Sequence, residues 1–514
     1  MKKSTLTRGL LTLAIAVATQ SAVADLPEYQ KSSSWFTDSQ TLLQQKLQNS
    51  REQKAVKNVI LFVGDGMGVS TLTAARILEG QQQGKTGEEN FLSFEKFPFS
   101  GLVKTYNTNQ QTPDSAGTMT AMMSGVKTKA GVINISEDTL RADCASSKGK
   151  EVSTLLEMAE YQGMATGVVT TARITHATPA ATYAKTPERD WEYSAKGDCK
   201  DIATQMIEFP IGDGIDVAMG GGRRNFLPKE MKDVEGKSGK RTDGVNLVET
   251  WKSKHAQGVY IETQAQFDAI PAGTKQVLGL FNDSHMRYEA DRANDTAGEP
   301  SLTEMTKKAL SVLKQNDKGF FLMVEGGRID HGHHAGSAYN ALTDAIEFSK
   351  AVKAATENVN LDETLILVTA DHSHVFTIAG YPTRGNPILG LVVSNDKTGS
   401  AQTSPVLADD NKPYTAVGYQ NGLGYADLGT TTDADARYNS GALGGRAVDL
   451  SSVDTKSSGF HQEALVPLQD SETHAGEDVA IHATGASAYL VQGDMEQHQI
   501  FHIMSRALGL SKSE

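Results

Sequence analysis

The stretch LILVTADH, residues 365–372, closes a short apolar run with a carboxylate and an imidazole, Asp371 and His372. A second stretch, FFLMVEGGRIDHGHH at residues 320–334, follows its apolar run with the same kinds of side chain. Such short, β-rich runs predict buried strands of a parallel sheet. Open α/β sheets carry their active sites at the carboxyl ends of these strands. Metal-assisted chemistry is therefore the first hypothesis for this chain.

Four more apolar runs predict strands, at Val59–Val63, Gly167–Thr170, Ile215–Met219 and Ile388–Val393. Helical patterns lie between several runs, at Leu302–Leu313 and Ala338–Val352. This alternation predicts a doubly wound α/β fold, with a mostly parallel central sheet flanked by helices. A chain of 514 residues exceeds the usual size of one core. We therefore expect an α/β catalytic domain, residues 57–379 and 460–514, that carries an insertion.

The predicted insertion covers residues 380–459, where Gly, Asp, Ser, Thr and Asn dominate and helical periodicity is absent. We expect a loop-rich, crown-like cap there. Disorder is the alternative, but four tyrosines supply apolar anchors that a disordered linker usually lacks. They are Tyr414, Tyr419, Tyr425 and Tyr438.

Residues 25–56 form a polar arm with a predicted helix over 39–51, where Ser39 is a plausible cap. Leu42, Leu43 and Leu47 give this helix an apolar stripe that needs a surface to cover it. A partner subunit is one such surface, so we expect a homodimer.

Residues 1–24 have the pattern of a signal peptide. Three cations lead an apolar stretch that ends in small residues: Lys2, Lys3 and Arg8, then Leu10–Ala18, then Ala22-Val23-Ala24. Cleavage before Asp25 would yield an exported protein, periplasmic or secreted. The apolar stretch is much shorter than the roughly 20 residues that span a bilayer, so no membrane anchor is expected.

The chain is acidic, with a formal net charge of -13 that becomes -16 without the three cations of residues 1–24. Such a charge disfavours binding to a nucleic acid backbone, and we predict no nucleic acid groove. An anion site on this protein must carry local cations of its own, and bound metal ions would provide them.

Cys144 and Cys199 are the only cysteines. An even count in an exported chain predicts a disulfide, and two free thiols are the alternative. Neither cysteine lies in a CxxC motif, which argues against a cysteine metal site.

Asp65 lies in VGDGMG, directly after the run at 59–63. A dinucleotide-binding G-x-G-x-x-G motif fails here because Val69 occupies the third glycine position. A carboxylate between two glycines suits a closely approached ligand, although a simple turn is an equal alternative.

Ser115 lies in PDSAGTMTA, at the start of a helical pattern. A helix cap is the commonest role for such a serine. The alternative is a nucleophile, and without a G-x-S-x-G elbow a metal ion would have to lower its pKa.

His176, Thr178 and Arg189 follow the run at 167–170. Taken singly, Thr178 reads as a turn former and Arg189 as part of a solvated loop. His474, isolated in ETHAGED, reads as a structural residue.

Glu325, Asp330, His331 and His334 fall within ten residues, and such a group is costly to place without a function. Asp330 and His334 are spaced i, i+4 and would share a helix face that suits one divalent ion. Together, the strand ends supply ligands for two Zn²⁺ ions bound by N and O atoms and one Mg²⁺ bound by O atoms.

The motifs resemble those of the alkaline phosphatases, in the branch that includes the animal enzymes. They run in family order from about Asn58 to Val479: VGDGMG, PDSAGTMTA, THATPAATYA with Arg189 beyond it, VEGGRIDHGHH, LVTADHSHVF and ETHAGEDV. The resemblance implies hydrolysis of small phosphate monoesters through a phosphoserine.

The resemblance also implies roles for individual residues. Ser115 would be the nucleophile, and Arg189 would bind the phosphate. The implied metal ligands are Asp330, His334 and His474 for the first zinc, Asp65, Asp371 and His372 for the second, and Asp65, Thr178 and Glu325 for magnesium. His176 and His331 would act through water, and Cys144 and Cys199 fall where the animal enzymes carry a disulfide.

Two departures limit the resemblance. Asn282 follows Leu280-Phe281 where the animal enzymes have a glutamate of a calcium site, so we do not assign calcium. The chain ends in Ser-Lys-Ser-Glu without an apolar tail, so the lipid anchor of animal relatives is not expected.

Two rival functions remain open. A phosphodiesterase or sulfatase of the same superfamily is the nearer one, although the sulfatase C/S-x-P-x-R motif is missing. A secreted metal-binding protein without activity is the other, and it predicts a lost nucleophile or incomplete ligands.

Overall fold

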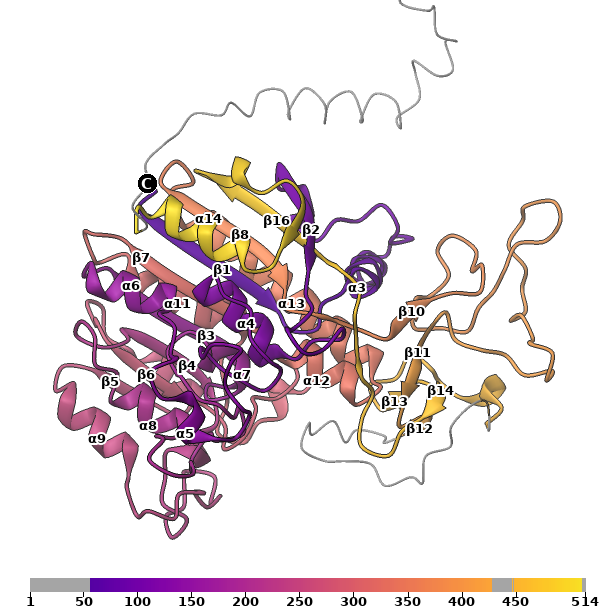
Figure 1. Ribbon diagram of the computed structural model, residues 1–514. Helices are drawn as coiled ribbons and strands as arrows, with labels where there is room; N and C mark the ends of the chain where they lie inside the picture. The colour runs from indigo at the N-terminus through magenta and orange to yellow at the C-terminus, as the bar shows by residue number, and fades with distance from the viewer. Residues whose placement is uncertain (1–55, 428–445, 447, 511–514) are drawn as a thin grey trace, which may run out of the picture. The chain divides into compact units, whose positions relative to one another are not determined.

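Ten strands form the central sheet of the computed structural model, in the order β17-β2-β16-β8-β1-β7-β3-β4-β6-β5 (Figure 1). The structure describes residues 56–427, 446 and 448–510. The strands of this sheet are β1 (Asn58–Gly64), β2 (Phe99–Lys104), β3 (Ala165–Arg173), β4 (Val217–Gly221), β5 (Val259–Ile261), β6 (Val277–Leu280), β7 (Phe320–Gly326), β8 (Thr364–Ala370), β16 (Val479–Gly485) and β17 (Gly493–Glu496).

Seven neighbouring strands, from β8 to β5, run parallel to one another. Only β16 runs against its neighbours, β8 and β2. Every residue of β1, β7 and β8 is buried, as expected for strands covered on both faces. The structure thus confirms the predicted mostly parallel α/β sheet.

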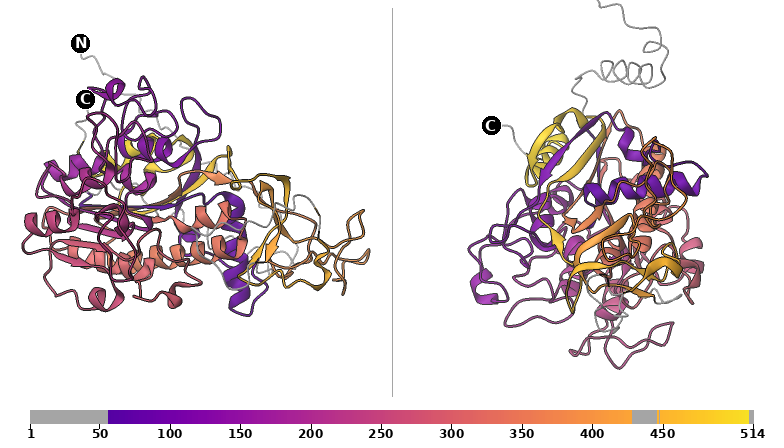
Figure 2. Two further views of the ribbon diagram at one scale, coloured as in Figure 1. Left: turned by 90° about the horizontal axis from the view of Figure 1, so that it is seen from below. Right: turned by 90° about the vertical axis from the view of Figure 1, so that its right-hand side faces the viewer.

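Helices cover both faces of the sheet (Figure 2). On one side, α11 (Leu302–Leu313) and α13 (Ala338–Asn358) pack on β1, β3 and β7, and α3 (Val69–Gln82) packs on α13. On the other side lie α4 (Ser115–Ser124), α6 (Leu155–Tyr161), α7 (Ala177–Ala180) and α14 (Gln499–Ala507). The other α-helices of the described residues are α5 (Cys144–Ser147), α8 (Ile202–Ile207), α9 (Leu247–Lys254), α10 (Gln264–Asp268) and α12 (Arg328–His334).

The predicted helices 302–313 and 338–352 are both present. Helix α11 has the predicted bounds, and its Ser301 cap accepts a hydrogen bond from the backbone N–H of Glu304. Helix α13 begins at the predicted residue and continues to Asn358.

Beyond β8 the chain builds smaller sheets. Strands β10 (Phe376–Ile378), β11 (Val417–Gly422) and β14 (Ala464–Pro467) form a three-stranded sheet. Two further pairs are β12 (Ala426–Asp427) with β13 (Phe460–His461), and β9 (Ser373–His374) with β15 (His474–Ala475). Strands β10 and β14 lie outside the predicted 380–459 insertion, and that division of the chain stays a prediction.

The predicted strand at 388–393 is wrong. Gly390 N–H donates to the carbonyl of Pro387, which closes a turn inside the run, and only Leu391 forms an isolated bridge, to Thr415. The apolar side chains Ile388, Leu389 and Val392 are nevertheless buried, so their hydrophobicity reflects packing of a loop.

Cys144 and Cys199 form a disulfide with their Cα atoms 5.8 Å apart, which confirms the predicted pair. The predicted signal peptide and the 39–51 helix lie outside the described residues. None of the described helices combines the length and apolar character needed to cross a bilayer.

Candidate active site

The carboxyl ends of four parallel strands meet at one edge of the sheet. Gly64 at the end of β1 is level with Gly326 of β7 and Ala370 of β8, and Thr170 of β3 is level with Glu325. Asp65 and Asp371 therefore leave neighbouring strands side by side, as the sequence predicted for this edge.

A tight turn holds Asp65 against Asp371. Gly66 adopts a positive φ of 68°, and its N–H donates to Asp371 Oδ1 at 3.0 Å. A side chain at position 66 would also strike His374, because a Cβ there would lie 2.3 Å from His374 Nε2. The glycines of VGDGMG thus serve a close approach between strand ends.

Asp65, Asp371 and His372 form the first group of candidate ligands. His372 Nε2 lies 3.4 Å from Asp65 Oδ1 and 3.3 Å from Asp371 Oδ2. All three side chains have no solvent exposure. These are the residues that the resemblance assigns to the second zinc.

Asp330, His334 and His474 form the second group. Helix α12 places Asp330 and His334 one turn apart, with Oδ1 and Nε2 separated by 3.3 Å. Strand β15 brings in His474, whose Nε2 lies 3.4 Å from Asp330 Oδ1 and 3.1 Å from His334 Nε2. The structure thus joins a residue that looked isolated in sequence to the predicted i, i+4 pair.

Asp65 also takes part in a third group, with Thr178 and Glu325. Thr178 Oγ1 lies 3.4 Å from Asp65 Oδ2, and Glu325 Oε2 accepts from Thr170 Oγ1 at 2.5 Å. His176 offers a ring nitrogen within 4.8 Å of the Asp65 and Glu325 oxygens. The oxygen-rich character of this group suits magnesium.

The ligand spacing fits metal ions. Three atoms held 2.0–2.1 Å from one tetrahedral zinc lie roughly 3.3 Å from one another. The five measured separations in the two aspartate and histidine groups run from 3.1 to 3.4 Å. Buried oxygens Asp371 Oδ2 and Glu325 Oε1 also have no hydrogen-bond partner. A cation would satisfy both.

The pKa shifts of the candidate ligands also favour a bound cation. Burial first, and then neighbouring carboxylates, raise the pKa of Asp65 and Asp371, and the pKa of Glu325 reaches about 8. Burial and nearby His474 hold the pKa of His372 well below its usual range, so that ring is neutral. Metal ions bind neutral imidazoles and ionised carboxylates. A bound cation would supply the counter-charge that these buried carboxylates lack.

Ser115 is the first residue of α4, and 2% of it is exposed. Its Oγ lies 3.1 Å from His372 Nε2. The predicted capping role falls instead to Asp114, which accepts from the Gly117 N–H. Ser115 therefore does not cap the helix, and its hydroxyl faces the candidate metal ligand His372.

Asp114 also fixes Arg189, with Nη1 3.0 Å from Asp114 Oδ2. Although burial raises the pKa of Asp114, Arg189 and the N–H of Gly117 outweigh it and lower that pKa. Asp114 is not among the residues predicted from the sequence, although an aspartate directly before a helix start is a capping signal.

Arg189 donates through Nη2 to His176 Nε2 at 3.1 Å. His331 lies beside His176, with ring centroids 5.6 Å apart. A third imidazole, His285, comes from the loop after β6, and its centroid lies 3.9 Å from that of His331. Nothing in the sequence pattern singled out His285.

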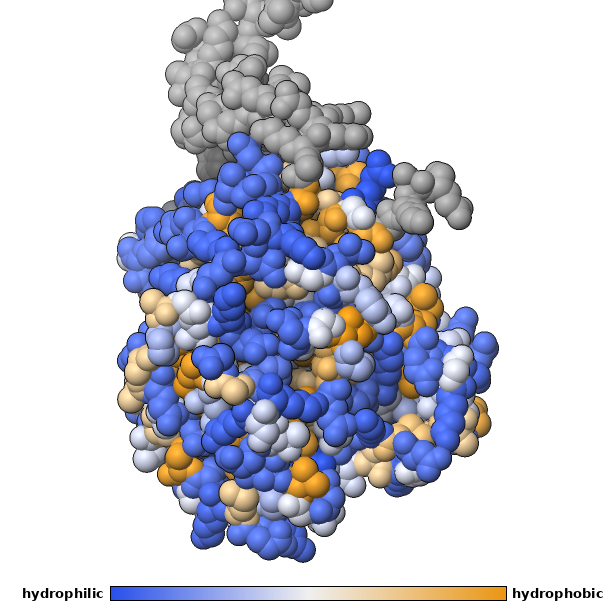
Figure 3. All heavy atoms as spheres, turned by 90° about the vertical axis from the view of Figure 1, so that its left-hand side faces the viewer, coloured by the Kyte–Doolittle hydropathy of each residue, from blue (hydrophilic) through white to orange (hydrophobic). Residues whose placement is uncertain are grey.

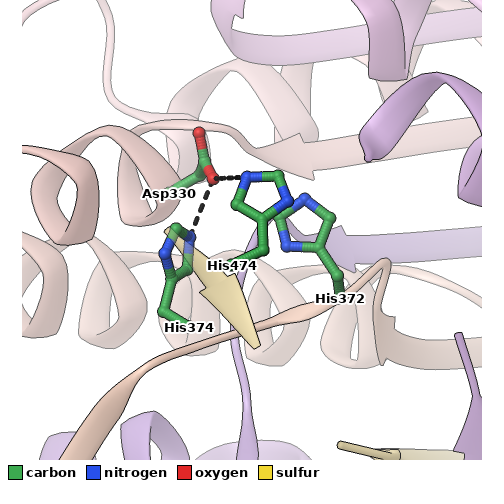
Figure 4. Close-up of side chains that lie close together, drawn as sticks. All are labelled: Asp330, His372, His374 and His474. Carbon is green, nitrogen blue, oxygen red and sulfur yellow. Dashed lines mark hydrogen bonds and ion pairs between the residues drawn. The ribbon is translucent and has the colours of Figure 1, made fainter. Parts of the chain in front are cut away.

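His374 and Glu472 are two further residues of the site that were not predicted from the sequence. His374 Nε2 lies 2.8 Å from Asp330 Oδ1 and its Nδ1 lies 2.6 Å from Glu472 Oε2. Burial opposes a charge on this ring, but Glu472 and Asp330 raise the pKa of His374 to about 10. Figure 4 shows His374 and His474 both directed at the Asp330 carboxylate, with His372 stacked on His474.

The doubly wound sheet carries a buried serine, an arginine and clustered carboxylates and imidazoles at its carboxyl edge. This combination is typical of metal-dependent hydrolases that transfer phosphoryl groups. The sequence profile of the family described as alkaline phosphatase matches residues 56–510. The chain belongs to the alkaline phosphatase family. This confirms the resemblance and the predicted enzyme class, a phosphoric monoester hydrolase.

Animal relatives match nearly the whole chain. The tissue-nonspecific alkaline phosphatases of Felis catus and Homo sapiens are each 43% identical, over 96% of this chain and 92% of theirs. The alkaline phosphatase of Gadus morhua is 43% identical over 90% of this chain and 93% of its own.

Solved structures share the fold. The alkaline phosphatase of Thermus thermophilus has a TM-score of 0.65 at 24% identity, covering 95% of this chain and 96% of its own. That of the Antarctic bacterium TAB5 has a TM-score of 0.60 at 22% identity, covering 90% of this chain and 100% of its own.

Proposed function

We propose that this chain hydrolyses phosphate monoesters to an alcohol and inorganic phosphate through a phosphoserine formed on Ser115. One observation carries the proposal: the buried Ser115 hydroxyl lies 3.1 Å from His372 Nε2, the atom that also faces Asp65 and Asp371. A nucleophile needs such a neighbour, because a free serine hydroxyl is weak.

The donor atoms fit two Zn²⁺ ions and one Mg²⁺ ion. Asp330, His334 and His474 would hold the first zinc, Asp65, Asp371 and His372 the second, and Asp65, Thr178 and Glu325 the magnesium. Bound there, the ions would supply positive charge for a dianionic substrate and would lower the pKa of the serine hydroxyl and of water.

Residues of the chain itself bind and orient the substrate. The guanidinium of Arg189 matches two phosphate oxygens, and Asp114 and His176 hold its two Nη atoms. The N–H groups of the first turn of α4 add a positive helix terminus beside Ser115. His176 and His331 would contact the bound phosphate through water molecules.

The reaction exchanges bonds at phosphorus in two steps. Ser115 Oγ forms a bond to phosphorus while the bond to the ester oxygen breaks, and the alcohol leaves with a proton. Water then attacks the phosphoserine, and Ser115 Oγ regains its proton as phosphate departs.

We also infer that the protein is exported, to the periplasm or outside the cell, and that it acts as a homodimer on small monoesters. The signal pattern of residues 1–24 supports export, and the apolar stripe of residues 39–51 supports a dimer. Figure 3 shows a face of mostly hydrophilic residues with hydrophobic ones scattered among them, in keeping with the acidic composition.

Metal analysis combined with a phosphomonoesterase assay tests the proposal. The purified protein should contain zinc and magnesium and should hydrolyse p-nitrophenyl phosphate. Chelation should abolish turnover, and added Zn²⁺ and Mg²⁺ should restore it. Turnover without zinc, or turnover that resists chelation, would overturn the metal assignment.

A comparison with a diester separates the nearest rival. Initial rates on p-nitrophenyl phosphate should exceed those on bis(p-nitrophenyl) phosphate, because Arg189 and the third ligand group suit a dianion. Faster diester hydrolysis would favour a phosphodiesterase. Zinc binding without turnover of either ester would favour a metal-binding protein that has lost its activity.

A further inference from the structure

We propose that His285 is a positioning residue for phosphate binding, because its ring packs against the rings of His331 and His176 and holds them in place. This inference rests on the proposed role of Arg189. His285 lies in a loop that is hydrogen-bonded to the sheet, its Nδ1 accepts from the Arg173 backbone N–H, and its ring packs against two other imidazoles.

The loop that carries His285 is fixed to the sheet by backbone hydrogen bonds on both sides of the residue. Gly222 N–H donates to the Ser284 carbonyl at 2.6 Å, and Met286 N–H donates to the Thr171 carbonyl at 3.0 Å. A Cβ on Gly221 would lie 2.1 Å from the Ser284 carbonyl oxygen. The loop therefore seats at the ends of β3 and β4 only because glycine stands there.

The ring of His285 is clamped by Arg173. The Arg173 backbone N–H donates to Nδ1 at 3.1 Å, and Arg173 Nη1 lies 2.5 Å from Nε2. Arg173 is itself held by Glu192, whose two carboxylate oxygens lie 2.9 and 3.1 Å from Arg173 Nε. The Arg173 backbone N–H makes Nδ1 the acceptor of the ring, so the imidazole of His285 is held through that nitrogen.

Two functional imidazoles pack on this fixed ring. The His331 centroid lies 3.9 Å away and the His176 centroid 5.5 Å away. Arg328 Nη1 donates to Nδ1 of His331 at 3.2 Å. The ring proton of His331 is therefore on Nε2, which can act as a donor. A donor of this kind orients water or phosphate only if its ring is held in place.

His176 connects the same support to the phosphate-binding arginine. Its Nε2 accepts from Arg189 Nη2 at 3.1 Å, so the position of the His176 ring sets one arm of the fork. Removal of the His285 ring would release both imidazoles on one side. Phosphate affinity should then fall, whereas the metal ligands and Ser115, which His285 does not contact, should keep their places.

Kinetics and phosphate binding on the metal-loaded enzyme test the proposal. For His285→Ala we expect the KM for p-nitrophenyl phosphate and the dissociation constant of inorganic phosphate to rise about five-fold, with kcat within about two-fold. His285→Phe keeps an aromatic ring but loses the Nδ1 acceptor, so both constants should recover only in part, to about two- to three-fold above those of the unsubstituted enzyme.

His255→Ala is the matched control. His255 is also half-buried, stacks on Trp251 with centroids 5.0 Å apart and bonds Gln276 through Nδ1 at 2.9 Å, but lies away from the site. It should lower Tm without changing KM. If His285→Ala lowers only Tm, or if His285→Phe binds phosphate no better than His285→Ala, the positioning role is wrong.

Direct phosphate binding separates this inference from the proposed function. Failure of the proposed function would appear as a metal-loaded enzyme that binds phosphate but does not turn over monoesters. The His285 inference would still stand or fall on whether His285→Ala weakens phosphate binding by calorimetry.

Discussion

Ser115 Oγ lies 3.1 Å from Nε2 of His372, which at first sight is a serine with a general base. The geometry argues otherwise, because the same Nε2 faces the carboxylates of Asp65 and Asp371 at 3.4 and 3.3 Å. The other ring nitrogen, Nδ1, is buried without a hydrogen-bond partner, whereas a triad histidine is oriented there by a carboxylate. His372 is therefore better suited to hold a cation beside the hydroxyl than to take its proton.

Ser115→Ala should reduce kcat by at least about 1,000-fold, because no other group at the site replaces the nucleophile. Zinc and magnesium contents should stay unchanged, since the serine hydroxyl belongs to none of the proposed ligand sets. Steady-state kinetics and elemental analysis check both. Ser124→Ala, at the other end of α4, is the control. Near-normal turnover in the Ser115 variant would refute the covalent mechanism.

Arg189→Lys should lower kcat/KM by about 10- to 100-fold, because lysine keeps the charge but loses the planar fork. Arg141→Lys is a matched control, since Arg141 makes a two-point contact with Glu188 on an exposed surface. Equal effects of the two substitutions would mean that the fork geometry of Arg189 has no special part in binding.

His374→Ala should weaken zinc binding by about 10- to 100-fold, as is typical when a hydrogen bond to a metal ligand is lost. The reason is that Asp330 loses its 2.8 Å contact with His374 Nε2 and can rotate. Titration of the chelated protein with Zn²⁺ measures the effect. His482→Ala removes a histidine that packs on Phe94 and should leave zinc affinity unchanged. An unaltered zinc titration for His374→Ala would show that Asp330 needs no such support.

Glu160 should make stability depend on pH at the opposite end of β3 from the site. Burial, then Asp216 and Asp213, raise the pKa of Glu160 to about 8, although Thr166 Oγ1 donates to its Oε1. The unfolded value is about 4.3. Folding therefore favours the protonated form, and stability is lost as the pH rises from about 4.3 through 8.

Glu160→Gln removes that titration and should raise Tm by a few degrees at pH 9, with little change at pH 4. Thermal unfolding across this range measures the difference. Glu208→Gln, which alters a more exposed glutamate paired with Lys200, should change Tm little at either pH, because an exposed ion pair contributes little to stability. A Glu160→Gln curve parallel to that of the unsubstituted protein would contradict the assignment.

Reduction of the Cys144–Cys199 disulfide should lower the free energy of unfolding by about 2–4 kcal/mol, because the bond restricts a loop in the unfolded chain. The bridge links residues 55 apart in sequence and touches none of the ligand sets. The double variant Cys144→Ser/Cys199→Ser should therefore lose stability and keep its KM. A change in KM at full metal loading would mean that the bridge also shapes the site.

The strands that sequence predicted well are those buried on both faces. Strands β1, β7 and β8 are uninterrupted apolar runs, and no other element gives that pattern at such short length. Strand β16 was not predicted, although its buried residues Val479, Ile481 and Ala483 alternate with more exposed ones, as expected for a strand with one more exposed face. Strand β2, FSGLVK, is too polar to be predicted from its sequence. It is stabilised by backbone hydrogen bonds to β16 on one side and β17 on the other.

The residues missed at the site are those that act through another residue. His374 and Glu472 lie two residues from His372 and His474, a spacing that puts side chains on one side of an extended chain. That signal was present in the sequence. His285 had none, because its importance depends on a loop after β6 that reaches across two strands to His331.

The order of the sheet joins segments that are far apart in the sequence. Among the described residues, β2 pairs with β16 and β17, so residues 99–104 need residues 479–496 as their hydrogen-bonding partners. His474, a proposed ligand, arrives in the same late segment, paired through β15 with β9. A chain stopped before residue 474 would have an exposed edge at β8 and an incomplete first ligand group. The site is therefore complete only with residues 474–496, which follow all the other proposed ligands in the sequence.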